Sequence, residues 1–416
     1  MPKLASSLPF GIGAVDWQER INMRCLREER NERLRQTMKK HSVAACLIAQ
    51  AEDMRYATGL RVPLFIGQIN YCLFSMEYET VCWINAGYYE HFKNQAPWIK
   101  AENFRIGRSW LGGICGVEAT RQEAKLFAAE IASELEEKGL AGEKLGVTGF
   151  DSPGIEALRE AGIKTFDARP MILEARMVKQ PTEILCIKMA AAIADVGFYK
   201  IYDTLKPGVR DVDIAAASIK VMMERNPDHP GRIAVFSGPN TFERGFETTD
   251  RIIQVGDMVY CDIAHLQFLG YNTCYYRCFI CGRKPNDKEK DWHKAVLEKQ
   301  NAVIDAIKPG ATTADAAKHF PPASKWGYPD EVYVLTLEIG HGVGLCLYEL
   351  PVINRQWSLK YPQVFEVGNV MSIESREGEW GMGGARLEDM IVVTENGAEI
   401  IGRTPRDEII VAGAMV

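Results

Sequence analysis

Hydrophobic and polar positions follow two alternating patterns in the first 175 residues. Segments such as Arg20 to Lys40 and Arg121 to Lys138 place apolar residues at the three- and four-residue intervals of amphipathic helices. Between them lie short β-rich runs, including VAACLIAQ, NYCLFSM and TVCWINA. Because helices that alternate with short strands are typical of α/β folds, we expect residues 1–175 to form an α/β domain.

A long helix marks the start of a second domain. Pro181 and Thr182 are helix-start signals, and Pro207 with Gly208 is a stop signal, so we predict a helix from Thr182 to about Leu205. We therefore place the second domain at residues 176–416.

This second domain repeats its own pattern. The run LKPGVRDVD, from Leu205, recurs as IKPGATTAD, from Ile307. A β-like run then follows in each half, GDMVYCDIAH and GNVMSIESRE, with a carboxylate (Asp262, Glu374) six residues after the glycine. Proline-glycine helix ends could coincide by chance, but the second spacing repeats independently. We predict an α+β domain of two related halves, each with helices followed by a β-hairpin, around a pseudo-two-fold axis.

Composition and charge narrow the function. The chain has 416 residues, a net charge of -6 and a pI near 5.8, which gives no basic footprint for nucleic acid or an acidic membrane face. No segment approaches the roughly 18 apolar residues of a membrane span, and the N-terminus lacks a signal-peptide pattern. We expect a cytoplasmic protein with a small-molecule or peptide partner. Eleven cysteines without a regular framework predict free thiols.

The repeat brings polar groups together. If the two hairpins face each other, Asp262 and Glu374 converge, and Glu388 on the return strand joins them. Like charges this close favour a divalent cation, for which His341, between two glycines in EIGHGVGLCLYELP, would be a nitrogen ligand. Taken singly, each residue could equally be a hydrogen-bonded loop histidine or a solvated strand glutamate. Spacing and duplication together favour a site.

These residues resemble the pita-bread-fold enzymes, which include aminopeptidase P, prolidase, methionine aminopeptidase, creatinase and the metal-dependent DMSP lyase. The resemblance covers about residues 176–402, through GDMVYCD, GHGVGL, VMSIES and RLEDMIVVTENG. AEDMRYATG also resembles a segment of the N-terminal creatinase-like domain. The resemblance implies a creatinase-like α/β domain followed by a pita-bread catalytic domain, and a homodimer in which one N-terminal domain overhangs the other chain's site.

The resemblance also implies a metal site with one substitution. Its ligands would be Asp262, Cys274, His341, Glu374 and Glu388, with Cys274 where the family has a second aspartate. A thiolate is a soft ligand that bridges two ions less readily than a carboxylate does. We expect at most one divalent transition metal per chain (Fe, Zn or Mn), or none.

The activity is harder to assign because two family histidines are absent. Tyr348 stands where peptidases have the second histidine, and SGPNTFERGFETTDR contains no histidine. Those histidines assist the tetrahedral intermediate of amide hydrolysis. We therefore predict a non-peptidase lyase or hydrolase that cleaves a C–S, C–N or C–O bond in a small polar substrate. It is closest in pattern to the DMSP lyase, although Leu347 replaces that enzyme's catalytic aspartate. The alternatives are a metal-dependent Xaa-Pro aminopeptidase or prolidase-like hydrolase, and an inactive binding scaffold.

Several further side chains are candidates for the site. Besides His341, Glu374 and Glu388, the catalytic candidates are Tyr348 and Tyr271, whose hydroxyls could move a proton. The substrate-binding candidates come from the glycine-rich loop GEWGMGGAR and from the aromatic stretch RVPLFIGQINY: Trp380, Arg386, Phe65 and Tyr71. Core or loop packing would explain the aromatic candidates equally well.

Overall fold

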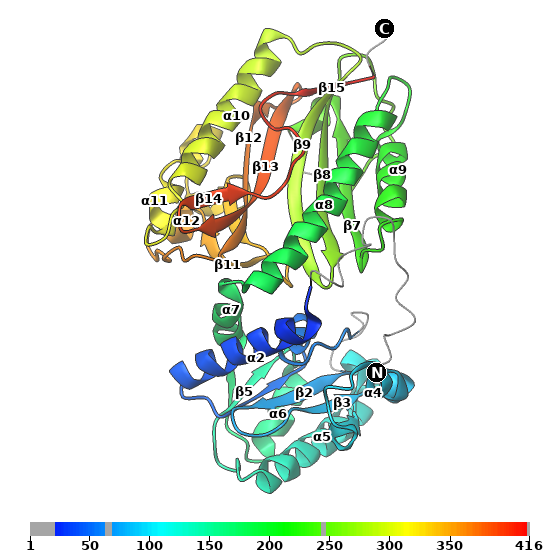
Figure 1. Ribbon diagram of the computed structural model, residues 1–416, viewed down its shortest axis with the longest axis vertical. Coiled ribbons are helices and arrows are strands. Elements are labelled where there is room, and N and C mark those ends of the chain that lie inside the picture. The colour runs from blue at the N-terminus through cyan, green and yellow to red at the C-terminus, as the bar shows by residue number, and fades with distance from the viewer. Residues whose placement is uncertain (1–20, 63–68, 243–246, 414–416) are drawn as a thin grey trace. The chain divides into compact units, whose positions relative to one another are not determined.

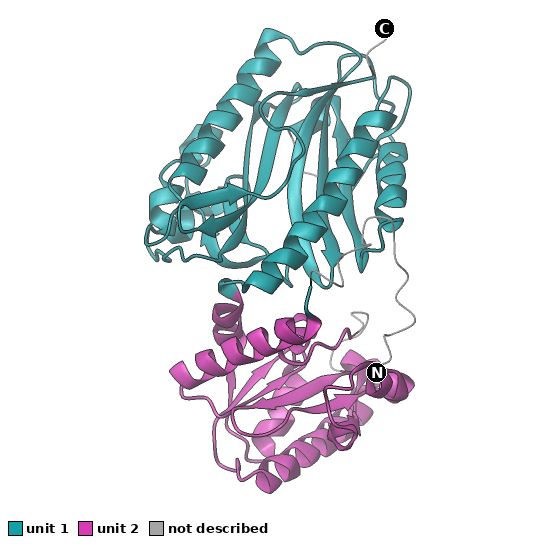
Figure 2. Ribbon diagram, in the orientation of Figure 1, with its two compact units in different colours: residues 1–22, 177–416 teal, residues 23–176 magenta. Residues whose placement is uncertain are grey.

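The computed structural model describes residues 21–62, 69–242 and 247–413 (Figure 1). They form two compact units, one of residues 23–176 and one that continues from Met177 (Figure 2).

The first unit is built on a six-stranded mixed sheet with the order β4-β3-β2-β1-β5-β6. β1 pairs antiparallel with β2 and parallel with β5. The strands are β1 (Ala45–Ile48), β2 (Tyr71–Ser75), β3 (Val81–Ile84), β4 (Phe104–Ile106), β5 (Leu145–Thr148) and β6 (Thr165–Asp167). The first three lie within the predicted β-rich runs.

Helices complete this α/β unit. They are α2 (Met23–Lys40), α3 (Ala51–Thr58), α4 (Tyr89–Gln95), α5 (Val117–Glu137), α6 (Ser152–Glu160) and α7 (Arg169–Met177), with short 3-10 turns at Ala86–Tyr88, Ala101–Asn103 and Leu111–Gly113. A core of side chains from α5, α6 and one face of the sheet includes Leu47, Phe127 and Leu158. The predicted amphipathic helix from Arg121 to Lys138, which corresponds to α5, therefore packs its apolar face against the sheet.

A buried carboxylate links α3 to α7 in this unit. Asp53 is fully buried, and its carboxylate accepts hydrogen bonds from Arg176 at 2.5 Å, Arg169 at 2.6 Å and the Thr148 hydroxyl at 3.0 Å. A buried charge is tolerated when it is paired and hydrogen-bonded in this way. Asp53 belongs to the AEDMRYATG segment, which thus has a structural role.

The second unit consists of two halves, each with helices followed by a long hairpin, and the second half contains additional short elements. The first half contains α8 (Pro181–Thr204), α9 (Asp211–Met223), β7 (His229–Ser237), η4 (Gly238–Thr241), β8 (Met258–Phe268) and β9 (Tyr271–Cys281). The second contains α10 (Asp287–Asp305), α11 (Thr313–Ala317), η5 (Ala323–Trp326), η6 (Glu331–Val334), β10 (Ile339–Gly342), β11 (Glu349–Ile353), α12 (Arg355–Ser358), β12 (Val370–Glu379) and β13 (Gly383–Thr394), followed by β14 (Gly397–Ile400) and β15 (Ile410–Ala412). Helices followed by a long hairpin in each half confirm the predicted architecture.

Two sheets carry the residues of interest. One has the order β15-β9-β8-β7 and the other β11-β10-β12-β13-β14. In Figure 1, α8 lies across β8 and β9, and α10 lies along β12 and β13. The sheets meet where β9 approaches β13: the Arg386 amide donates to Cys278 Sγ at 2.9 Å, and Arg277 Nη1 donates to the Glu388 carbonyl at 2.5 Å. Side chains near this seam can therefore come from both halves.

None of the described helices combines the length and the apolar character that crossing a membrane requires.

Candidate active site

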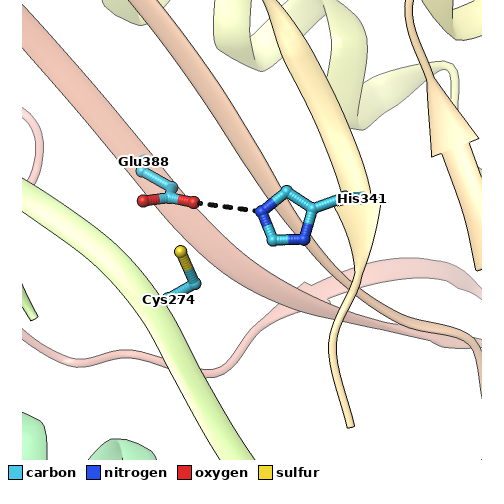
Figure 3. A group of neighbouring side chains, drawn as sticks. All are labelled: Cys274, His341 and Glu388. Atoms are coloured by element: carbon cyan, nitrogen blue, oxygen red, sulfur yellow. Dashed lines mark ion pairs between the residues drawn. The ribbon is translucent and has the colours of Figure 1, made fainter. Parts of the chain in front are cut away.

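Three strands bring a thiol, an imidazole and a carboxylate together. Cys274 comes from β9, His341 from β10 and Glu388 from β13, and their ligand atoms all lie within 4.8 Å of one another (Figure 3). The side chains are buried, and His341 Nε2 lies 3.7 Å from Glu388 Oε1. The structure thus joins three of the five ligands that the sequence predicts.

His341 has the tautomer that suits a metal ligand. Its Nδ1 lies 3.1 Å from the carbonyl oxygen of Gly342, and because a carbonyl only accepts, Nδ1 carries the proton. In the neutral imidazole, Nε2 then has the lone pair, and it lies 3.7 Å from Glu388 Oε1. Gly342 is required here: a Cβ would lie 2.2 Å from the Leu350 carbonyl oxygen. The backbone next to His341 therefore lies so close to the Leu350 carbonyl that only glycine fits at position 342.

The other two predicted ligands lie beside tyrosine hydroxyls. Glu374 is directly opposite Glu388 in the β12–β13 pair, and Asp262 is opposite Tyr276 in the β8–β9 pair. The Tyr276 hydroxyl donates to Glu374 Oε2 at 3.0 Å, and the Tyr260 hydroxyl donates to Asp262 Oδ2 at 3.1 Å. The sequence analysis missed Tyr260, although its position two residues before Asp262 puts both on one face of a strand.

Burial controls the protonation of these groups. It raises the pKa of the Cys274 thiol well above its usual value, and the nearby Glu388, Asp262 and Glu374 raise it further. Burial also raises the pKa of Tyr260 and of Tyr276, so both hydroxyls stay neutral donors. A divalent cation would reverse the balance at Cys274 because it favours the thiolate.

The donor set fits a divalent metal. Thiolate, imidazole and carboxylate are the ligands that zinc and related first-row ions accept in proteins, and here all three come from rigid strands. The Gly342 carbonyl that orients His341 is the kind of outer partner that such ligands have.

A polar clamp holds the loop between β10 and β11 over the site. Tyr348 stacks on the His341 ring, with ring centroids 4.0 Å apart, yet remains 44% exposed. The Asn272 side-chain amide donates to the carbonyls of Gly344 at 3.0 Å and Leu345 at 2.9 Å. The Glu349 carboxylate accepts from the Cys346 amide at 2.9 Å. Tyr348 is thus placed between the buried imidazole and solvent.

Two of the tyrosines proposed from the sequence do not lie at this site. Tyr271 is fully buried and donates to Glu183 at 2.7 Å; it is three residues from Cys274, so it projects from the opposite face of β9. Tyr71 is 1% exposed and packs against Trp83 and Phe127 in the core of the first unit. Neither residue is available for the predicted catalytic or substrate-binding role.

The remaining substrate-binding candidates differ in what they contact. Arg386 is 3% exposed, and its guanidinium donates to the carbonyls of Thr241 at 3.0 Å and Phe242 at 2.7 Å. It anchors the segment after β7, and its buried guanidinium is used by these backbone carbonyls and not by a substrate as predicted. Trp380 is 61% exposed at the tip of the β12–β13 hairpin and stays a prediction. Phe65 lies outside the described residues.

Comparison with known proteins gives two family matches. The model of "Metallopeptidase family M24" matches residues 185–395, and that of "Creatinase/Prolidase N-terminal domain" matches residues 30–178. Among curated proteins, the Xaa-Pro dipeptidase of Pyrococcus furiosus is 30% identical over 298 residues, which are 70% of this chain and 83% of the relative. That of Pyrococcus horikoshii is 26% identical over 387 residues, 92% of this chain and 99% of the relative. The crystal structure of the prolidase from Pyrococcus horikoshii OT3 superposes with a TM-score of 0.72 at 25% identity, covering 91% of this chain and 99% of that one.

These comparisons contradict the predicted activity. The relatives carry the names Xaa-Pro dipeptidase and prolidase, so the prediction of a non-peptidase lyase or hydrolase similar to the DMSP lyase is wrong. The prediction gave too much weight to the two missing histidines, whereas similarity over most of the chain points to the alternative, a Xaa-Pro hydrolase.

Proposed function

The chain belongs to metallopeptidase family M24, and on that premise we propose that it is a metal-dependent hydrolase that cleaves Xaa-Pro dipeptides. The observation that carries the proposal is the convergence of Cys274, His341 and Glu388 within 4.8 Å in the matched region. Residues 176–416 would be the catalytic domain.

The metal site would use the residues predicted from the sequence. Cys274, His341 and Glu388 would hold a divalent ion, with Asp262 and Glu374 beside it, and each chain would hold no more than one ion. When bound, the ion would supply Lewis-acid polarisation of the scissile carbonyl and lower the pKa of a water molecule. Cys274 supports a single ion because a thiolate is a poor bridge between two cations.

The chain's own residues would move the protons. Glu374 accepts a proton from the attacking water, and the Tyr276 hydroxyl on its Oε2 keeps the carboxylate in place. Tyr348, which is partly exposed above His341, donates its hydroxyl proton to the leaving proline nitrogen. Tyr348 would thus have the proton-transfer role that its hydroxyl suggested from the sequence.

The test is release of proline from Ala-Pro and Gly-Pro by metal-stripped protein to which Mn²⁺, Co²⁺ or Zn²⁺ is added back. We expect turnover only with metal, and its loss in His341→Ala. The matched control is His319→Ala, since His319 is an exposed histidine of the same unit. Equal activity in His341→Ala and His319→Ala would place the chemistry elsewhere.

We further propose that the protein is a homodimer. The resemblance implies that one chain's N-terminal domain overhangs the other chain's site, and the match of residues 30–178 to the creatinase/prolidase N-terminal domain supports the presence of such a domain. Light scattering at micromolar concentration should give twice the 46.6 kDa chain mass. A monomeric mass would refute the dimer without affecting the metal site.

A further inference from the structure

Two of the five predicted ligands are hydrogen-bonded to tyrosines, and the other three lie close together. Within the described part of the chain, the group of mutually close ligand atoms consists of Cys274, His341 and Glu388. The other two carboxylates, Asp262 and Glu374, each accept a hydrogen bond from a tyrosine hydroxyl, at 3.1 Å from Tyr260 and 3.0 Å from Tyr276. The division follows the strands, since Tyr260 and Asp262 share one face of β8 and Cys274 and Tyr276 share one face of β9.

The tyrosines are rigidly placed. Their rings pack against each other edge to face, with centroids 4.9 Å apart, and both belong to a buried cluster with Ala234 and Phe236. The guanidinium of Arg386 lies 5.1 Å above the Tyr260 ring. With exposures of 6% for Tyr260 and 2% for Tyr276, neither hydroxyl can rotate into solvent. A carboxylate that is hydrogen-bonded to such a group keeps its orientation.

The hydroxyls of Tyr260 and Tyr276 help to stabilise the negative charges of Asp262 and Glu374. Glu374 and Glu388 are buried and Asp262 is partly buried, so the charges of these neighbouring carboxylates need compensation, and a second cation is one way to supply it. A neutral hydroxyl that donates to a carboxylate oxygen also stabilises the ionised form, and it uses electron density which that oxygen would otherwise give to a metal. Tyr260 and Tyr276 therefore reduce both the need and the capacity for a second ion.

We propose that Tyr260 and Tyr276 are positioning residues that hold Asp262 and Glu374 back, so that Cys274, His341 and Glu388 bind a single thiophilic divalent ion. The expected class is Zn²⁺, Co²⁺ or Fe²⁺ in preference to Mn²⁺ or Mg²⁺, because a thiolate and an imidazole make up two of the three donors. This inference rests on the proposed function only for the catalytic use of the site.

The test is a Co²⁺ titration of the metal-free, full-length protein followed by absorption. The wild type should saturate at one equivalent and show thiolate-to-cobalt charge transfer in the near ultraviolet, and Cys274→Ser should lose that absorption. Tyr260→Phe/Tyr276→Phe should take up a second equivalent of Co²⁺ and bind Mn²⁺ more tightly than the wild type does. Each single variant should give the same changes in smaller measure.

The matched control is Tyr275→Phe. Tyr275 lies next to Tyr276 but on the opposite face of β9, where its hydroxyl donates to Asp195 at 2.9 Å, so it should leave the Co²⁺ stoichiometry unchanged. If Tyr260 and Tyr276 instead support carboxylates that bind the ion, their removal should weaken Co²⁺ binding about 10–100-fold at unchanged stoichiometry. That outcome, or a wild-type spectrum without thiolate charge transfer, would overturn the inference. Stoichiometry and absorption need no turnover, so failure of Ala-Pro hydrolysis would bear on the proposed function alone.

Discussion

The buried ion pair between Lys179 and Glu349 should be tolerated only as a pair. Lys179 Nζ lies 3.0 Å from Glu349 Oε2, and both side chains are 1% exposed. Glu349 also accepts from the Cys346 amide, so the pair fixes the loop that carries Tyr348 over His341. Removing one partner leaves the other charge buried and uncompensated, whereas removing both charges leaves none.

The magnitudes follow from this burial. Lys179→Met should lower the free energy of unfolding by about 3–5 kcal/mol, the range for a broken buried pair. Lys179→Met/Glu349→Gln should cost only about 1 kcal/mol, because glutamine keeps an oxygen that accepts from the Cys346 amide. The double variant should therefore be more stable than the single variant that it contains.

Urea unfolding measures these differences as changes in midpoint at constant slope. The matched control is the exposed pair Lys188–Glu399, with a separation of 3.4 Å and exposures of 41% and 58%, for which Lys188→Met should cost less than about 1 kcal/mol. If Lys179→Met costs no more than Lys188→Met, or if the double variant is as unstable as the single one, the Lys179–Glu349 pair does not clamp this loop.

Three other predictions concern separate parts of the chain. Asp53→Ala should destabilise the first unit by about 3–5 kcal/mol, because Arg176 is then buried without its carboxylate; unchanged thermal unfolding would contradict this. Burial raises the pKa of Glu338 above its ordinary 4.5 despite its contact with Lys299. Because the folded state then binds this proton more tightly than the unfolded state does, the free energy of unfolding should fall as pH rises from 4.5 towards the raised pKa. Glu338→Gln should flatten the dependence of the urea midpoint on pH between pH 4.5 and 7. An unaltered slope would mean that other groups cause this pH dependence. Tyr348→Phe keeps the ring on His341 and should lower kcat about 10²–10⁴-fold at unchanged Co²⁺ affinity, whereas Tyr348→Leu should also weaken Co²⁺ binding; full activity in Tyr348→Phe would remove the hydroxyl from the mechanism.

The fold was predictable because its signals are periodic. The repeated glycine-to-carboxylate spacing placed Asp262 and Glu374 on equivalent strands, and both lie in the long hairpins of the structure. Cys274, His341 and Glu388 converge as expected, since strand alternation fixes the face from which each side chain projects. Periodicity thus predicted the strands and their carboxylates, whereas Cys274 was expected only from the resemblance to the pita-bread-fold enzymes.

Aromatic residues were predicted less well. A tyrosine in a strand has the same local pattern whether it faces a core or a site, so Tyr71 was taken for a substrate contact although it packs inside the first unit. Tyr271 could have been rejected by its odd spacing from Cys274, and Tyr260 could have been found by its even spacing from Asp262. The hydrogen bonds of Tyr260 and Tyr276 depend on the approach of two strands and two sheets, which one sequence does not encode locally.

The activity was mispredicted because an absence was treated as decisive. Missing histidines remove one way of moving a proton, but in the structure the ring of Tyr348, which carries a hydroxyl, stacks on His341 in the same region. Similarity to the Pyrococcus Xaa-Pro dipeptidases extends over most of the chain and outweighs two positions.

The most direct test of the account measures proline release from Ala-Pro against the equivalents of Co²⁺ bound to the metal-free protein. Activity should rise linearly, reach its maximum at one equivalent per chain, and disappear when a chelator removes the ion. Proline release that is absent at every metal loading, or that continues to rise to two equivalents, would contradict a single-metal Xaa-Pro hydrolase built on Cys274, His341 and Glu388.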